Sequence, residues 1–108
     1  MKLKEIINLI EKWAPLELAE DFDNVGLILG DENVEVKKAL ITLDTLENVV
    51  DEAVENKCDL IISFHPIIFD GLKKITNKTY VKRVISKSIK NNINIYAIHT
   101  NLDNHPKG

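Results

Sequence analysis

The sequence predicts a layered α/β/α domain with a mostly parallel sheet. Short apolar runs typical of strands alternate with segments whose apolar residues recur at helical spacing. Two of these runs, residues 60–62 and 93–98, are apolar almost throughout, which is typical of strands covered on both faces. The 108 residues are enough for one hydrophobic core but few for a complete enzyme of this class. We therefore expect residues 1–108 to form a single α/β domain and to be a fragment of a larger subunit.

The first predicted element is an amphipathic helix at the start of the chain. Pro15 cannot continue an α-helix, so we expect this helix to end near Ala14. Residues 25–29 then read as a short strand, closed by the turn residues 30–33. Five apolar residues share one face of the helix and form its predicted buried stripe: Leu3, Ile6, Ile7, Ile10 and Trp13.

A second strand and a second helix are predicted next. Residues 39–43 form the strand, which stops at Asp44. Asp44 or Thr45 then caps a helix whose first turn holds Glu47, and the helix ends at residues 56–57. Its predicted buried face consists of Leu46, Val49, Val50, Ala53 and Val54.

The last part of the chain predicts a strand, a helix and a strand. Residues 60–62 form the third strand, followed by a strand-end loop at residues 63–66. A helix begins near Thr79 and ends at residues 91–92, and residues 93–98 form the fourth strand. Right-handed crossovers would make the last three strands parallel. The buried face of this helix is predicted to contain Tyr80, Val81, Val84, Ile85 and Ile89.

Composition limits the classes of partner. The net charge of -3 and the interspersed basic and acidic residues provide no basic surface for a nucleic-acid backbone, so nucleic acid is not expected as a principal partner. No apolar stretch approaches the ~20 residues of a membrane helix, and the chain opens with an amphipathic helix rather than a signal segment. We therefore expect a cytoplasmic protein without a membrane partner. Cys58 is the only cysteine, which excludes an internal disulfide and predicts a small buried apolar residue.

Two of the predicted strands lead into histidines. The third strand runs into His65 and the fourth into His99, with Asp103 four residues further on. Because the carboxyl ends of parallel strands meet at one edge of a sheet, these side chains can converge there together with Asp44. Imidazole suits zinc, iron, nickel and cobalt, and carboxylates extend the choice to manganese and magnesium. The pattern predicts a metal or catalytic site without selecting one metal.

Each of these residues also has a purely structural interpretation. His65 could cap a loop before Pro66. His99 could orient Asp103 instead of binding a metal, and Asp103 could simply form an Asx-turn. We interpret Asp44 as a helix cap rather than a ligand.

Four motifs together resemble one protein family. Residues 23–27 (Asp-Asn-Val-Gly-Leu), 43–45 (Leu-Asp-Thr), 62–69 (Ile-Ser-Phe-His-Pro-Ile-Ile-Phe) and 99–103 (His-Thr-Asn-Leu-Asp) occur in this order. They resemble the amino-terminal half of the Ngg-interacting-factor family, whose members are commonly named GTP cyclohydrolase 1 type 2 homologues. The resemblance implies a dinuclear metal site in an α/β subunit and assembly into a ring-shaped hexamer. It also implies that this chain is a truncated metal-binding domain, the amino-terminal half of a larger subunit.

The family's motifs assign roles to individual residues by position. His65 matches the second histidine of the family's His-His-Pro pair, Asp103 matches a metal-binding aspartate, and His99 matches the histidine of the same motif. Phe64 stands where the first histidine usually lies, and a phenyl ring cannot bind a metal. A later His and Glu of the family do not occur before Gly108. The resemblance thus implies His65, Asp103 and His99 as metal ligands, and a divalent ion of the zinc, iron or manganese class that this chain binds weakly or not at all.

Three functions remain open. In a metal-dependent hydrolase, His65 and Asp103 would hold the ion that activates water, and His99 would act as a ligand or as the catalytic proton carrier. The family name points to a purine nucleotide as substrate, although the sequence contains no P-loop. A non-catalytic metal-binding or regulatory scaffold that forms a ring-shaped oligomer is the alternative, and Phe64 favours it. The third is a folded fragment without activity of its own.

Overall fold

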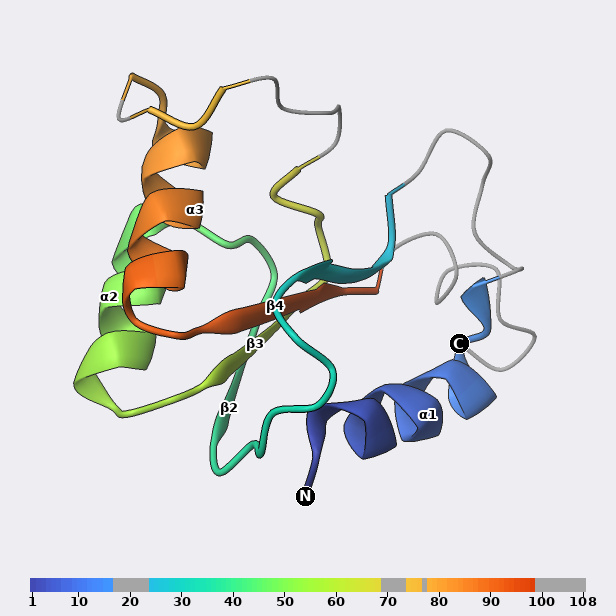
Figure 1. Cartoon of the computed structure of the whole chain (residues 1–108). Helices are drawn as coiled ribbons and strands as arrows, with labels where there is room; N and C mark the ends of the chain where they lie inside the picture. The colour runs from blue at the N-terminus through green and yellow to red at the C-terminus, as the bar shows by residue number, and fades with distance from the viewer. Residues whose placement is uncertain (17–23, 69–73, 77, 99–108) are drawn as a thin grey trace.

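The computed structural model describes residues 1–16, 24–68, 74–76 and 78–98. Its elements follow the predicted order of helix, two strands, helix, strand, helix and strand (Figure 1). They are α1 (Leu3–Trp13), β1 (Gly26–Leu29), β2 (Ala39–Thr42), α2 (Glu47–Glu55), β3 (Leu60–Ser63), α3 (Tyr80–Lys90) and β4 (Asn94–Ala97).

The four strands form one mixed sheet in the order β1-β4-β3-β2. The pairs β2–β3 and β3–β4 are parallel, as the crossover argument predicted, and β1 pairs antiparallel with β4. The two nearly continuous apolar runs, β3 and β4, occupy the interior positions, and every residue of β4 is buried. The predicted fold class is therefore confirmed.

Helices cover both faces of the sheet. In Figure 1, α1 lies on one side, and α2 and α3 lie together on the other. Because side chains alternate along a strand, Leu60 and Tyr96 pack toward α1, whereas Ile61 and Ile95 pack toward the two other helices. The buried helical residues in the two resulting clusters are Leu3 and Ile7 on the first side, and Val50, Ala53, Val84 and Ile85 on the second.

The predicted helical faces are right in their centres and wrong at their ends. Five residues expected in the buried stripes are instead 39–52% exposed, and each lies at or beside a helix terminus. Periodicity identifies the face of a helix, but it does not show how far along that face the sheet extends. The five exposed residues are Trp13 in α1, Leu46 and Val54 at the ends of α2, and Tyr80 and Ile89 at the ends of α3.

Two further sequence predictions concern single side chains. Thr79 is the N-cap of α3, and its hydroxyl accepts a hydrogen bond from the backbone N–H of Lys82. Cys58 is a buried free thiol just before β3, as expected. Within the described ranges, no helix is both long and apolar enough to cross a membrane.

Candidate metal centre

The candidate site begins where β2 and β3 end side by side. Thr42 and Ser63 are register partners in this parallel pair. The pairing continues beyond the strands, since the backbone N–H of Phe64 donates to the Thr42 carbonyl (3.1 Å) and that of His65 donates to the Leu43 carbonyl (2.9 Å). The backbone of His65 is therefore fixed against the segment that follows β2.

Two hydroxyl groups tighten the same strand ends. The fully buried Ser63 donates its hydroxyl hydrogen bond to the His65 carbonyl at 2.7 Å and lies 3.3 Å from the Leu43 carbonyl. The Thr42 hydroxyl donates to the Asp44 carbonyl at 3.0 Å. The backbones that carry Asp44 and His65 are thus held by hydrogen bonds on both strands.

The side chains of Asp44 and His65 meet across this edge. Asp44 Oδ1 lies 2.6 Å from His65 Nδ1, and the two side chains are 47% and 43% exposed. The prediction that Asp44 or Thr45 caps the second helix is wrong, because α2 has Leu46 as its N-cap and no side-chain capping bond. Because α2 begins at Glu47, Asp44 lies outside the N-cap position. Its carboxylate contacts the His65 imidazole instead.

The phenyl ring of Phe64 lies beside the imidazole ring of His65. Its ring centroid lies 5.2 Å from that of His65, with the ring planes tilted by 56°. The side chain is partly buried. A donor group in place of this phenyl ring would therefore lie close to His65.

The central strand β4 ends at the same edge. Ala97 is the register partner of Ser63, and the backbone N–H of Ile98 donates to the Ser63 carbonyl at 2.9 Å. His99 follows directly in the sequence, but His99 and Asp103 lie outside the described residues, and their roles as ligands stay predictions.

A neighbouring contact joins the third of the four motifs to the first. Asn24 donates its side-chain amide hydrogen bond to the carbonyl of Ile68, in the segment that follows His65. Asp23 lies outside the described residues. The start of β1 and the loop after β3 are therefore in contact.

The donor chemistry at this edge fits a metal. A histidine that binds a metal through one ring nitrogen usually donates the N–H of the other nitrogen to a carboxylate, a backbone carbonyl or a water molecule. This hydrogen bond fixes the orientation of the ring. His65 and Asp44 form such a pair. No group of three or more His, Cys, Asp or Glu side chains that could hold an ion occurs within the described part of the chain, so a complete set needs donors from outside it.

The sequence interpretation placed Asp44 at the correct edge but assigned it the wrong contact. The sequence shows that Asp44 and His65 each follow a predicted parallel strand. That these two strands are neighbours is shown by the structure. N-cap preferences favoured Asp44 as a helix cap, because Asp is common at that position. They carry no information about a contact with His65, twenty-one residues away.

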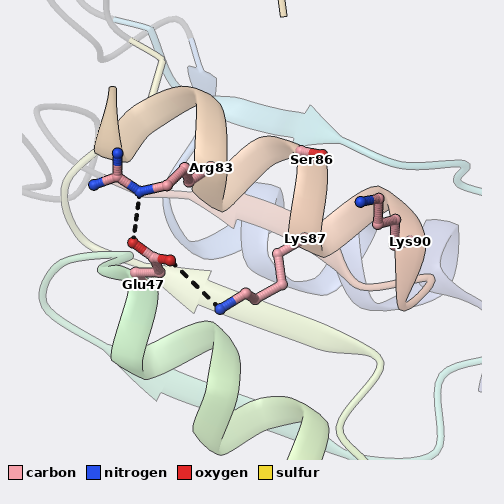
Figure 2. Close-up of a pocket in the computed structure, with 5 residues that line it drawn as sticks. All are labelled: Glu47, Arg83, Ser86, Lys87 and Lys90. Carbon is pink, nitrogen blue, oxygen red and sulfur yellow. Dashed lines mark hydrogen bonds and ion pairs between the residues drawn. The ribbon is translucent and has the colours of Figure 1, made fainter. Parts of the chain in front are cut away.

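A separate groove lies between α2 and α3, and Figure 2 shows its charged lining. It has a volume of about 230 Å³. Glu47 bridges two cations, with Oε1 2.9 Å from Arg83 Nε and Oε2 3.5 Å from Lys87 Nζ, and Lys87 also lies 2.7 Å from Asp51. The hydrogen bond from Arg83 lowers the pKa of Glu47, and the one to Asp51 raises the pKa of Lys87. These charges pair with one another and join the two helices.

Comparison with known proteins identifies relatives along the whole chain. The family model for Duf34/NIF3 (NGG1p interacting factor 3) matches residues 1–108. A Clostridium acetobutylicum protein named GTP cyclohydrolase 1 type 2 homolog is 48% identical over 103 residues, which are 95% of this chain and 38% of that protein. A Bacillus subtilis protein of the same name is 45% identical over 93% of this chain and 27% of its own length.

Solved structures show the same fold. A Staphylococcus aureus crystal structure matches all of this chain and 35% of its own, with 44% identity and a TM-score of 0.95. A Bacillus cereus protein related to NIF3 matches 95% of this chain and 28% of its own, with 45% identity and a TM-score of 0.90. This chain thus spans well under half the length of the relatives it matches. The resemblance drawn from the four motifs is confirmed, and the chain belongs to the Duf34/NIF3 (NGG1p interacting factor 3) family.

Proposed function

We propose that this chain contributes a divalent-metal site at the carboxyl edge of its sheet and that the site serves a metal-dependent hydrolase. The proposed ligands are His65, Asp103 and His99. The observation that carries the proposal is the 2.6 Å contact between His65 Nδ1 and Asp44 Oδ1, because a carboxylate on one ring nitrogen is typical of a histidine whose other nitrogen binds a metal.

In this proposal, four residues of the chain would bind the ion, move a proton or orient a ligand. A divalent ion held there would lower the pKa of a bound water molecule to ~7. His65 and Asp103 hold the ion, with a neutral imidazole and a carboxylate as donors. His99 either completes the donor set or carries the proton that the reaction releases. Asp44 keeps the His65 ring in place.

The substrate class proposed first is a purine nucleotide. The support comes from the name GTP cyclohydrolase 1 type 2 homolog, which the Clostridium acetobutylicum and Bacillus subtilis relatives carry. The sequence contains no P-loop for a triphosphate, so the phosphates would need another binding surface.

A second function, a metal-binding or regulatory scaffold without catalysis, is supported by Phe64. Its phenyl ring lies beside His65, where the resembling family places a second imidazole, and it offers no donor. In this alternative, the full-length protein forms a ring-shaped homo-oligomer, a hexamer. The function then depends on that assembly and on its partners.

Metal affinity tests the site that both functions share. Isothermal titration with Zn²⁺ and with Mn²⁺ should show weak binding to the wild-type chain, at least ~10-fold weaker binding to His65→Ala, and tighter binding to Phe64→His. His105→Ala removes an imidazole that lies outside every motif and serves as the matched control, with no expected change. Equal affinities for the wild type and for His65→Ala, with circular dichroism showing both folded, would rule out the site.

Turnover then separates the hydrolase from the scaffold. GTP incubated with the Mn²⁺-loaded Phe64→His chain should be consumed, as measured by chromatography, and consumption should stop in the Phe64→His, His65→Ala double variant. Metal binding without loss of GTP or of other purine nucleotides would favour the scaffold.

A further inference from the structure

We propose that Asp44 is the positioning residue of the candidate metal centre: it holds the His65 ring in the tautomer protonated at Nδ1, so that Nε2 is the metal-binding nitrogen. This inference rests on the proposed function and deepens it. It assigns a role to a residue that the sequence placed at this edge of the sheet but interpreted as a helix cap.

The chemistry of the two side chains determines the direction of the hydrogen bond between them. An ionised carboxylate can only accept, so the 2.6 Å contact requires that His65 Nδ1 carries the hydrogen and donates it to Asp44 Oδ1. A donor bound to a carboxylate in this way makes a charge-assisted bond, which is shorter and stronger than a bond between neutral groups. With the proton on Nδ1, the lone pair of the neutral ring lies on Nε2.

The backbone places both residues before any ligand binds. His65 N–H is bonded to the Leu43 carbonyl, directly before Asp44, and the Ser63 hydroxyl is bonded to the His65 carbonyl. The Thr42 hydroxyl holds the Asp44 carbonyl. The two side chains therefore start from fixed positions on adjacent strand ends, and only their rotamers need to be selected. The carboxylate can make that selection for the ring.

Stability alone does not account for this pair. Both side chains are more than two-fifths exposed, and ion pairs with this exposure contribute little to folding. The orientation of a ligand, in contrast, depends strongly on such a partner, and removing a carboxylate from a histidine ligand typically weakens metal binding 10- to 100-fold. The contact is therefore expected to affect the tautomer and the metal affinity rather than the melting temperature.

Nitrogen NMR of the metal-free chain tests the positioning role directly. In the ¹⁵N-histidine-labelled wild type at about pH 8, where an ordinary imidazole is neutral, His65 should be protonated at Nδ1. Asp44→Ala should lose this preference, and Asp44→Asn, which keeps an acceptor oxygen without the charge, should retain part of it. Asp51→Asn removes the same charge from α2 and should leave the His65 tautomer unchanged. The wild-type tautomer persisting in Asp44→Ala would overturn the proposal.

Zinc titration of the same variants separates this inference from the proposed function. Affinity should fall about 10- to 100-fold in Asp44→Ala, with a nearly unchanged melting temperature, and should stay within about twofold in Asp51→Asn. If Asp44→Ala binds Zn²⁺ as tightly as the wild type does, the positioning role is wrong while the metal site stands. If Asp44 controls the tautomer but no variant, Phe64→His included, binds metal, the proposed function is wrong and the assignment of Nε2 as a ligand falls with it.

Discussion

At the scale of single residues, buried hydroxyl groups differ in whether they have a partner. The Tyr96 hydroxyl donates to Glu11 Oε2 at 3.0 Å and connects the central strand β4 to α1. Burial, helped by this hydrogen bond to a carboxylate, raises the pKa of Tyr96. The Ser88 hydroxyl in α3 is fully buried and has no hydrogen-bond partner among the described residues. The first hydroxyl should therefore stabilise the fold and the second should destabilise it.

This difference predicts opposite effects of two small deletions. Ser88→Ala should raise the free energy of unfolding by about 1 kcal/mol, because it removes an unsatisfied buried oxygen and alanine favours a helix. Tyr96→Phe should lower it by about 1 kcal/mol, because it removes a satisfied hydrogen bond and leaves Glu11 without that donor. Urea unfolding of both variants measures the effects, and a loss of stability in Ser88→Ala would contradict the assignment of Ser88.

The candidate site shows what could be predicted residue by residue. His65 was identified because an apolar strand leads into it, and strand position is a local property of the sequence. The contact of Asp44 with His65 could not be predicted in the same way, since it depends on the β2–β3 register. Asp44 was therefore placed at the right edge and given the wrong partner.

At the scale of elements, α2 and α3 are joined by charges on facing sides. Glu47 and Asp51, one turn apart on α2, meet Arg83 and Lys87, one turn apart on α3. The apolar periodicity predicted the buried faces of both helices but gave no account of these pairs, because it does not show which polar faces lie together. The bounds of α3, in contrast, followed from local signals, with Thr79 as its cap.

The charged contact between these helices predicts a pH-dependent stability. The pKa of Glu47 lies below its usual 4.5 in the folded chain, so its contribution is complete above pH 4.5 and is lost as the pH falls through the lower folded value. Lys87 has a pKa above its usual 10.5, so its contribution is complete below pH 10.5 and is lost at higher pH.

Glu47→Gln should consequently lower the melting temperature near neutral pH, and its difference from the wild type should shrink as the pH falls below 4.5. Glu55→Gln, at the exposed end of α2, is the matched control and should change little. Thermal melts monitored by circular dichroism at several pH values measure both. A constant difference between the wild type and Glu47→Gln at all acid pH values would contradict the assigned ion pairs.

At the scale of the whole molecule, the sheet separates strongly buried from strongly exposed apolar residues. Ile61 lies in the interior strand β3 and is completely buried, whereas Ile41 lies in β2 at the edge of the sheet and is 78% exposed. The sequence predicted both as strand residues. It did not predict which strand lies at the edge, since the order β1-β4-β3-β2 depends on contacts between distant segments.

The same deletion should thus have unequal effects at these two positions. Ile61→Ala should lower the free energy of unfolding by about 2–5 kcal/mol, because it leaves a cavity between the sheet and the two helices. Ile41→Ala should change it by less than about 0.5 kcal/mol. Comparable losses in urea unfolding would show that the edge strand is covered in solution.

The convergence of β2, β3 and β4 at one edge is the basis of the proposed metal centre. Anomalous diffraction from crystals of the chain soaked in Zn²⁺ tests it most directly. We predict a peak about 2.0–2.1 Å from His65 Nε2, with the Asp44 carboxylate bound to Nδ1 and with Asp103 or His99 as a further ligand. A Zn²⁺ peak only at other side chains, with the His65 ring bound to no ion, would contradict it.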